Sequence, residues 1–199
     1  MKKLVYLALG LLMLLLAAGC GAEGNNEDVS QERDFSDKNC GYVIPAGWVK
    51  SDKYSTDDKV FYVPDGHEDD EQPDNISVEI GTNKYAADEH VKFREAIVRQ
   101  LAMQLQGVPG LLTGDGRFTD NEDVLYVFTF REEALDENGE SEINLPEEER
   151  FVGVTTRQYY VVGEKKYALI HLTNFSGSEE TDAAAERMAT SFCWAEQDA

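Results

Sequence analysis

The sequence predicts an α+β domain built on a central, largely antiparallel β-sheet that is flanked by helices. Several segments alternate apolar and polar residues or concentrate β-branched and aromatic residues, as strands do. The two longest strand-like segments, 151–162 and 166–175, are separated only by Gly163-Glu164-Lys165, which favours a hairpin. Two other segments repeat apolar residues at helical spacing. Hairpin-linked strands with helices grouped around them are typical of α+β folds.

The first half of the predicted domain contains three strands. It opens at Cys40 with a short strand at 41–44 and a Pro-Ala-Gly-Trp turn at 45–48. Further strands are predicted at 59–63 and 76–80, and the acidic residues of 65–74 form the loop between them. The strand at 76–80 alternates apolar and polar side chains, which indicates a half-buried strand.

A helix is predicted from about Ala87 to Gln106, because its large apolar residues recur every four positions. Asp88 is a candidate N-cap, and Gly107 followed by Pro109 ends the helix. The predicted buried stripe consists of Phe93, Ile97, Leu101 and Leu105, widened by Ala96, Val98 and Ala102.

The second half is predicted to begin with a glycine-rich connection. Residues 110–123 are turn-rich with short extended pieces, and we interpret 113–123 as a turn between strands. A strong strand follows at 124–130, and an acidic loop occupies 132–149. The hairpin leads into a final helix, in which Ser176 is the candidate cap and Glu179 its capping-box partner. This helix runs to about Phe192, and the residues it is expected to bury are Ala184, Ala185, Met188 and Phe192.

The first twenty residues carry an export signal. Lys2 and Lys3 precede an apolar run from Leu4 to Ala18, and small residues lead to Cys20. The stretch Ala17-Ala18-Gly19-Cys20 resembles the lipobox of bacterial lipoprotein signal peptides, although Ala17 stands where leucine is commonest. The resemblance implies acylation of the Cys20 thiol and cleavage before it. A transmembrane anchor is the alternative, but the apolar run has fifteen residues and a bilayer needs about twenty.

The resulting organisation has four parts. Residues 1–19 are the signal peptide, 20–39 a flexible lipid-anchored tether, 40–195 one globular domain, and 196–199 a short tail. Acyl chains on Cys20 would hold the protein at the cell membrane on its extracytoplasmic side. Loss of the signal peptide changes the formal charge from −21 to −23, because Lys2 and Lys3 are its only charged residues. A chain this acidic repels nucleic acid, so nucleic-acid binding is excluded.

Two cysteines remain once Cys20 is assigned to the lipid. Cys40 and Cys193 lie near the two ends of the domain, and an exported protein permits a disulfide between them. We predict Cα atoms within about 7 Å of one another, the upper reach of a disulfide. Two buried free thiols are the alternative.

Two local signatures, together with the order of the elements, resemble the PsbP/Mog-one-like family. They are the opening stretch Gly41–Trp48 and the closing stretch Ala189–Trp194. The stretches 159–162 and 166–170 are similar to the long paired strands of the family. The resemblance implies a central antiparallel sheet sandwiched by helices. It also implies a binding or assembly role rather than an enzymatic one, and it supplies no ligand motif to carry over.

The histidines and acidic loops give no strong catalytic or metal signature. His67, His90 and His171 lack zinc-site spacing. His67 lies in an acidic loop that we interpret as solvated, and His171 lies in an apolar strand, as expected of a hydrogen-bonded core histidine. The acids of 113–123 lack EF-hand spacing. Nucleophile-elbow, phosphate-loop and dinucleotide motifs are absent from the sequence. We therefore assign no catalytic residue, no metal ligand and no cofactor.

The sequence thus favours a lipid-anchored, extracytoplasmic binding or assembly module that is not an enzyme. Its partners would be the membrane, through the anchor, and an envelope protein or a small ligand. Two alternatives remain at this point. One is a lipoprotein that binds a cation or metal through its acidic loops, and the other is a hydrolase of unrecognised type. A hydrolase would need a concave site with at least two convergent polar side chains.

Overall fold

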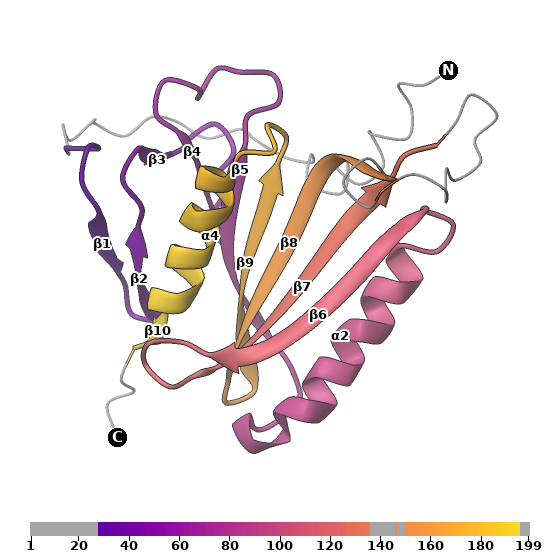
Figure 1. The fold of residues 1–199 in the computed structure, drawn as a ribbon. Helices are drawn as coiled ribbons and strands as arrows, with labels where there is room; N and C mark the ends of the chain where they lie inside the picture. Colours follow the sequence, from indigo (N-terminus) through magenta and orange to yellow (C-terminus); the bar gives the residue numbers. More distant parts are fainter. Residues whose placement is uncertain (1–27, 136–145, 147–149, 196–199) are drawn as a thin grey trace.

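The computed structural model of this chain describes residues 28–135, 146 and 150–195. They form a seven-stranded antiparallel sheet with an α-helix packed on each face and a separate three-stranded sheet beside one helix (Figure 1). The predicted α+β class with a largely antiparallel sheet is therefore confirmed. Every strand pair in both sheets is antiparallel.

The order of strands in the large sheet is β3-β4-β5-β9-β8-β7-β6, so the hairpin of β8 and β9 lies at its centre. Its strands are β3 (Trp48–Lys50), β4 (Lys59–Pro64), β5 (Asn75–Thr82), β6 (Gly110–Phe118), β7 (Val124–Glu133), β8 (Phe151–Gly163) and β9 (Lys166–Asn174). The small sheet contains β1 (Arg33–Ser36), β2 (Cys40–Ile44) and β10 (Cys193–Trp194) in the order β1-β2-β10. The helices are the short 3₁₀ helix η2 (Ala87–Glu89), α2 (His90–Gln104) and α4 (Glu179–Ser191).

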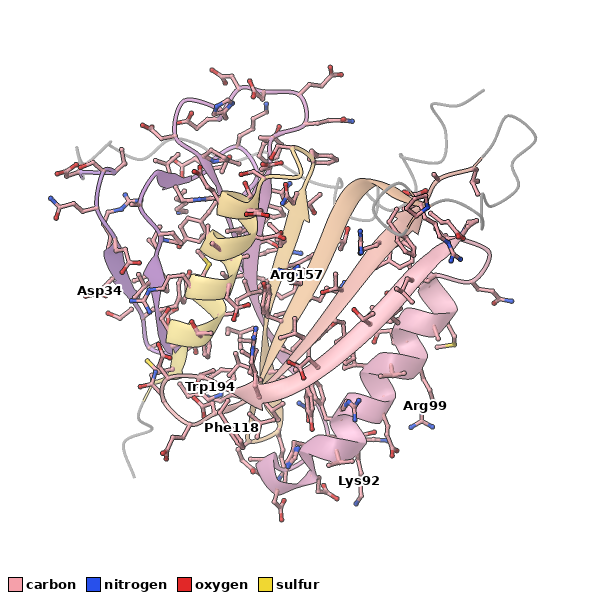
Figure 2. The ribbon with its side chains drawn as sticks, in the orientation of Figure 1. Asp34, Lys92, Arg99, Phe118, Arg157 and Trp194 are labelled. Atoms are coloured by element: carbon pink, nitrogen blue, oxygen red, sulfur yellow. The ribbon has the colours of Figure 1, made fainter. Side chains whose placement is uncertain are left out.

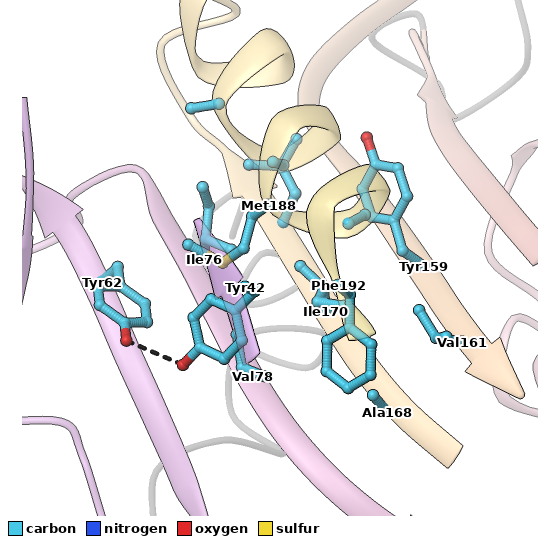
Figure 3. Packing of buried hydrophobic residues seen from close by; sticks show 14 of the residues in the cluster. Tyr42, Tyr62, Ile76, Val78, Tyr159, Val161, Ala168, Ile170, Met188 and Phe192 are labelled. Atoms are coloured by element: carbon cyan, nitrogen blue, oxygen red, sulfur yellow. Dashed lines mark hydrogen bonds between the residues drawn. The ribbon is translucent and has the colours of Figure 1, made fainter. Parts of the chain in front are cut away.

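The larger core lies between α4, the small sheet and one face of the large sheet (Figure 3). Met188 of α4 and the following Phe192 pack over Ile76, Ile170 and other apolar side chains of the central strands, and all four of these named residues are fully buried. Each large side chain buried in this way contributes about 1.5–3 kcal/mol. The burial predicted for the last helix is confirmed.

The second core lies on the opposite face, under α2. Phe93, Ile97 and Leu101 are the buried residues of α2, as the periodicity predicts. They pack with the aromatic rings of Tyr126, Phe128 and Tyr160 from β7 and β8. The helix starts later than expected, because residues 87–89 form a 3₁₀ turn and no side chain caps α2. Asp88 is therefore not the N-cap. Val98 and Ala102 do not widen the buried stripe, because both are exposed.

The glycine-rich segment 110–118 is a nine-residue strand, which corrects the prediction of a turn. Its glycines lie beneath aromatic rings of the neighbouring strand β7. A Cβ atom on Gly110 would lie 2.5 Å from the Phe130 ring, and one on Gly116 would lie 3.1 Å from the Tyr126 ring. Gly114 is covered by Phe128 in the same way. These glycines make room for cross-strand rings, so they are strand residues rather than turn residues.

The folded part of the chain begins well before Cys40, so the second half of the predicted tether 20–39 is not a tether. Residues 33–36 form β1 and pair with β2. The Phe35 ring stacks on Tyr42 with centroids 4.6 Å apart, and Arg187 donates two hydrogen bonds to the Glu32 carboxylate. Strand pairing, one stacked aromatic ring and an ion pair together attach this polar segment to the domain. Cys20 and the predicted signal peptide lie outside the described residues, as does the predicted tail 196–199.

The start of α4 is organised by a hydrogen-bonded network that differs from the expected capping box. Ser178, not Ser176, is the N-cap, and its hydroxyl accepts from the backbone N–H of Glu180. Ser176 instead donates to the Asp74 carboxylate, which also accepts from Thr181. Asp74 thereby joins the acidic loop before β5 to the first turn of α4.

The two ends of the domain meet at the ladder between β2 and β10. Cys193 lies opposite Gly41, and Trp194 lies opposite Cys40. Both cysteines are free thiols in the structure. Because side chains alternate along a strand, this register directs Cys40 and Cys193 to opposite faces of the ladder. A bridge between them would require the register to change, and it stays a prediction.

Candidate functional site

A polar strip covers the part of the sheet that lies beside α2, on the same face. Directly opposed residues of antiparallel strands share a face. One row of such residues runs Phe61, Ser77, His171, Gln158 and Phe128 across β4, β5, β9, β8 and β7. Phe128 belongs to the core beneath α2, so the rest of this row faces the same side.

A second row runs parallel to the first and completes the strip. Lys59, Glu79 and Leu169 lie opposite one another on β4, β5 and β9. Leu169 packs against the α2 core and marks the border of the strip. We call Lys59, Phe61, Ser77, Glu79, Gln158 and His171 the polar half-face.

His171 is the most unusual member of the polar half-face. Its ring is half-buried, its Nε2 atom is enclosed, and that atom has no hydrogen-bond partner among the residues that the structure describes. Burial, together with the nearby Lys59 charge, lowers the pKa of His171 to about 4. The imidazole is therefore neutral at physiological pH, with one N–H donor and one nitrogen acceptor. The expectation of a hydrogen-bonded core histidine is not met at Nε2.

The groups around His171 are held in place by charge and hydrogen bonds. Lys59 and Glu79 form an ion pair of 3.0 Å, and their side chains are only 17% and 33% exposed. The Tyr160 hydroxyl donates to Oε1 of Gln158 at 2.8 Å, which fixes the orientation of the amide beside His171. An enclosed polar nitrogen without a partner is uncommon, because desolvation of such a group costs about 1–3 kcal/mol. In a ligand site, the bound ligand can supply the missing hydrogen bond and so offset this desolvation cost.

The polar half-face does not contain an assembled nucleophile and base. Ser77 is 1% exposed and lies directly opposite His171, but no hydrogen bond joins the two side chains in the described part of the chain. A serine nucleophile requires that contact, with a third group that orients the base. The arrangement is suited to recognition by hydrogen bonding.

The other sequence candidates occupy different places. His67 is exposed, and its Nδ1 lies 2.7 Å from Asp70, whose hydrogen bond raises the pKa of His67. His90 Nδ1 lies 2.7 Å from the Tyr126 hydroxyl under the N-terminal end of α2. Within 28–135, 146 and 150–195, no group of three or more His, Cys, Asp or Glu side chains is arranged to hold a metal ion.

The face that carries α4 holds a second cluster of charges, but its members are paired. Arg157 reaches from β8 toward α4 (Figure 2) and donates to Thr129 at 3.1 Å and to Asp182 at 3.3 Å. Arg117 forms an ion pair of 2.5 Å with Glu186, although its buried Nε has no hydrogen-bond partner among the described residues. These contacts connect α4 with β6, β7 and β8, and we assign them a structural role.

Comparison with known proteins shows the fold and no closer relationship. No family model and no curated protein matches this chain. Among solved structures it is similar to the solution structure of cyanobacterial PsbP (CyanoP) from Synechocystis sp. PCC 6803, with a TM-score of 0.51 and 18% sequence identity. The match covers 89% of this chain and 98% of that chain. The resemblance seen in the sequence is thereby supported at the level of a PsbP-like fold.

None of the helices in the described residues is both long and apolar enough to span a membrane.

Proposed function

We propose that this protein is a lipid-anchored, extracytoplasmic binding or assembly module without enzymatic activity, and that the polar half-face contacts its ligand. The observation that carries the proposal is the unpartnered Nε2 of His171 between a shielded ion pair and an oriented amide. Because this nitrogen is enclosed, its ligand reaches it by displacing a neighbouring group. The PsbP-like fold supports a binding role by analogy only.

The anchor would keep the domain close to the membrane. Residues 17–20 resemble a lipobox, and Val29 already contacts the domain through a hydrogen bond from the Gly47 N–H to its carbonyl. The chain from Cys20 to Val29 would span at most about 30 Å when fully extended. A partner on the polar half-face would therefore be a component of the same envelope or a small molecule that reaches it.

The chemistry of the polar half-face selects a ligand with a polar, hydrogen-bonding group. A neutral imidazole donates one hydrogen bond, accepts another and carries no net charge. Lys59 and Glu79 neutralise one another at 3.0 Å, and the half-buried Phe61 offers an aromatic surface beside them. The expected ligand group is an uncharged hydroxyl or amide rather than a phosphate or a metal ion.

Site-specific photocrosslinking in living cells tests the binding surface. A photoreactive phenylalanine derivative would replace Phe61 of the polar half-face in one variant and Val98, exposed on α2, in a matched control. We expect a discrete adduct from position 61 that His171→Phe abolishes, and none from position 98. Equal adducts from both positions, or an adduct indifferent to His171→Phe, would contradict the proposal.

A separate variant tests the anchor. Cys20→Ser removes the thiol that would be acylated, so we expect the variant to retain its signal peptide and to incorporate no labelled palmitate. A labelled, mature-sized Cys20→Ser protein would refute the lipoprotein assignment.

A further inference from the structure

The outer edge of the large sheet is a long strand with nothing paired to it in the described residues. β6 is the last strand in the order, and seven of its nine residues are exposed (Figure 1). It contains no proline and no lysine, the residues that commonly protect sheet edges. The turn after it is fixed to the end of α4, because the Asp120 N–H donates to the Thr190 carbonyl at 2.8 Å.

Two hydrogen bonds, one at each end of β6, show which of its residues bond to β7 and which face outward. The Thr119 N–H donates to the Asp123 carbonyl, and the Glu133 N–H donates to the Pro109 carbonyl. Antiparallel pairs alternate between bonded and non-bonded positions. Odd-numbered residues of β6 therefore bond to β7, and even-numbered residues direct their N–H and C=O groups outward. Three of the five outward-directed residues are glycines, so no side chain on them obstructs a further strand: Gly110, Gly114 and Gly116.

The charges on β6 are self-complementary about Gly116. Asp115 and Arg117 flank this glycine, lie on one face of the strand and are opposite in sign, and Arg117 also keeps its ion pair with Glu186 of α4 in its own chain. A second copy of β6, antiparallel and related by a two-fold axis at Gly116, would place each Asp115 opposite Arg117 of the second copy. An axis at residue 115 or 117 would oppose like charges, and an axis at Gly114 would oppose Asp115 with Thr113. Residues 115 and 117 would form a non-bonded pair, the type in which side chains approach most closely.

The same register covers an exposed aromatic side chain. Phe118 is 66% exposed at the end of β6 (Figure 2). In the Gly116 register it would lie opposite Gly114 of the second copy, beside the Phe128 ring that already covers that glycine. The pairing thus buries apolar surface as well as satisfying backbone groups.

We infer that β6 pairs with β6 of a second copy of this chain to form a two-fold symmetric dimer with a continuous fourteen-stranded sheet, seven strands from each copy. The paired segment is short, so the dimer is weak in solution, because stable interfaces bury more than about 1,000 Å². The formal charge of −21 on each chain opposes association, but about 0.15 M salt screens this repulsion beyond roughly 8 Å.

Sedimentation equilibrium of the full chain in a mild non-ionic detergent at 0.15 M salt tests the dimer. We expect reversible dimerisation of the natural chain, and a dissociation constant about tenfold or more higher for Asp115→Arg, which opposes two pairs of like charges. Asp57→Arg carries the same change in charge on an exposed residue of the β3–β4 loop, and it should leave the dissociation constant within about twofold.

A charge exchange separates pairing from a loss of folding. Arg117→Asp should also dissociate, and mixing it with Asp115→Arg should restore a mixed dimer with two opposite-charge pairs. Near-identical circular dichroism spectra would show that the variants fold. A natural chain that stays monomeric, a dimer unaffected by Asp115→Arg, or two well-folded variants that do not associate on mixing would each overturn the inference. A monomeric chain that binds a strand of another protein at β6 would also overturn the inference.

Discussion

At the scale of single residues, the chemistry of this chain is concentrated in a few side chains that the sequence does not distinguish. His171 lies in an apolar strand, and most histidines in such strands are satisfied structural residues. Its identity as an enclosed nitrogen without a partner depends on Ser77 and Gln158, which lie opposite it on the flanking strands. The proposed ligand contact therefore depends on residues from three paired strands, and no sequence motif marks it.

The low pKa of His171 predicts a pH-dependent stability. The pKa is about 4 in the folded protein because of burial and the Lys59 charge, and about 6.5 in the unfolded chain. The unfolded chain therefore binds a proton first as the pH falls. The contribution is fully present above about pH 6.5 and is lost progressively toward pH 4. We expect a loss of about 2 kcal/mol in the free energy of unfolding between pH 7 and pH 5.

Urea unfolding of variants isolates this contribution from that of the carboxylates. His171→Gln should remove this part of the pH dependence, so the difference between it and the natural chain should shrink as the pH falls from 7 to 5. His67→Gln is the control, because the Asp70 hydrogen bond raises the pKa of His67 and so acts in the opposite direction. A constant difference between His171→Gln and the natural chain would show that His171 titrates normally.

At the scale of elements, the spacing of apolar residues predicts helices and strands that have a regular apolar pattern. It misses strands whose residues are explained only by contacts with a neighbouring strand. The buried residues of α2 and the hairpin of β8 and β9 follow directly from spacing in the sequence. β6 does not, because its glycines are explained only by the rings of Phe128, Phe130 and Tyr126 on the next strand. The strand β1 is missed for a similar reason, since Phe35 gains its burial from Tyr42.

The ladder of β2 and β10 gives a prediction about the two cysteines. Burial raises the pKa of Cys40 to about 12, so its thiolate is scarce near neutral pH. The Cys193 side chain is only half-buried and faces away from Cys40. Iodoacetamide applied to the folded protein without reductant should modify Cys193 much faster than Cys40, as measured by peptide mass spectrometry. If neither residue reacts until a reductant is added, the two form the disulfide and the register must differ.

At the scale of the whole molecule, the order of the strands creates the candidate site. The sequence supports the fold class, the main helices and the strands of the central hairpin, and alternation shows which residues of each strand share a face. It does not show that β5 pairs with β9, whose partner residues lie 84 (Thr82 and Lys166) to 98 (Asn75 and Thr173) positions apart in the sequence. This pairing brings Ser77 and Glu79 beside His171. Long-range pairing is decided by packing of the complete core, which no local pattern encodes.

The central claim is that the neutral imidazole of His171 on the polar half-face contacts the natural ligand. The most direct measurement is nitrogen NMR of the ¹⁵N-histidine-labelled protein, with and without detergent-solubilised membranes of the producing cell. We predict a neutral His171 whose Nε2 resonance shifts on addition of the membranes, whereas the resonances of the exposed His67 stay in place. A His171 signal that does not change, while another part of the protein binds a component of the same extract, would contradict the claim.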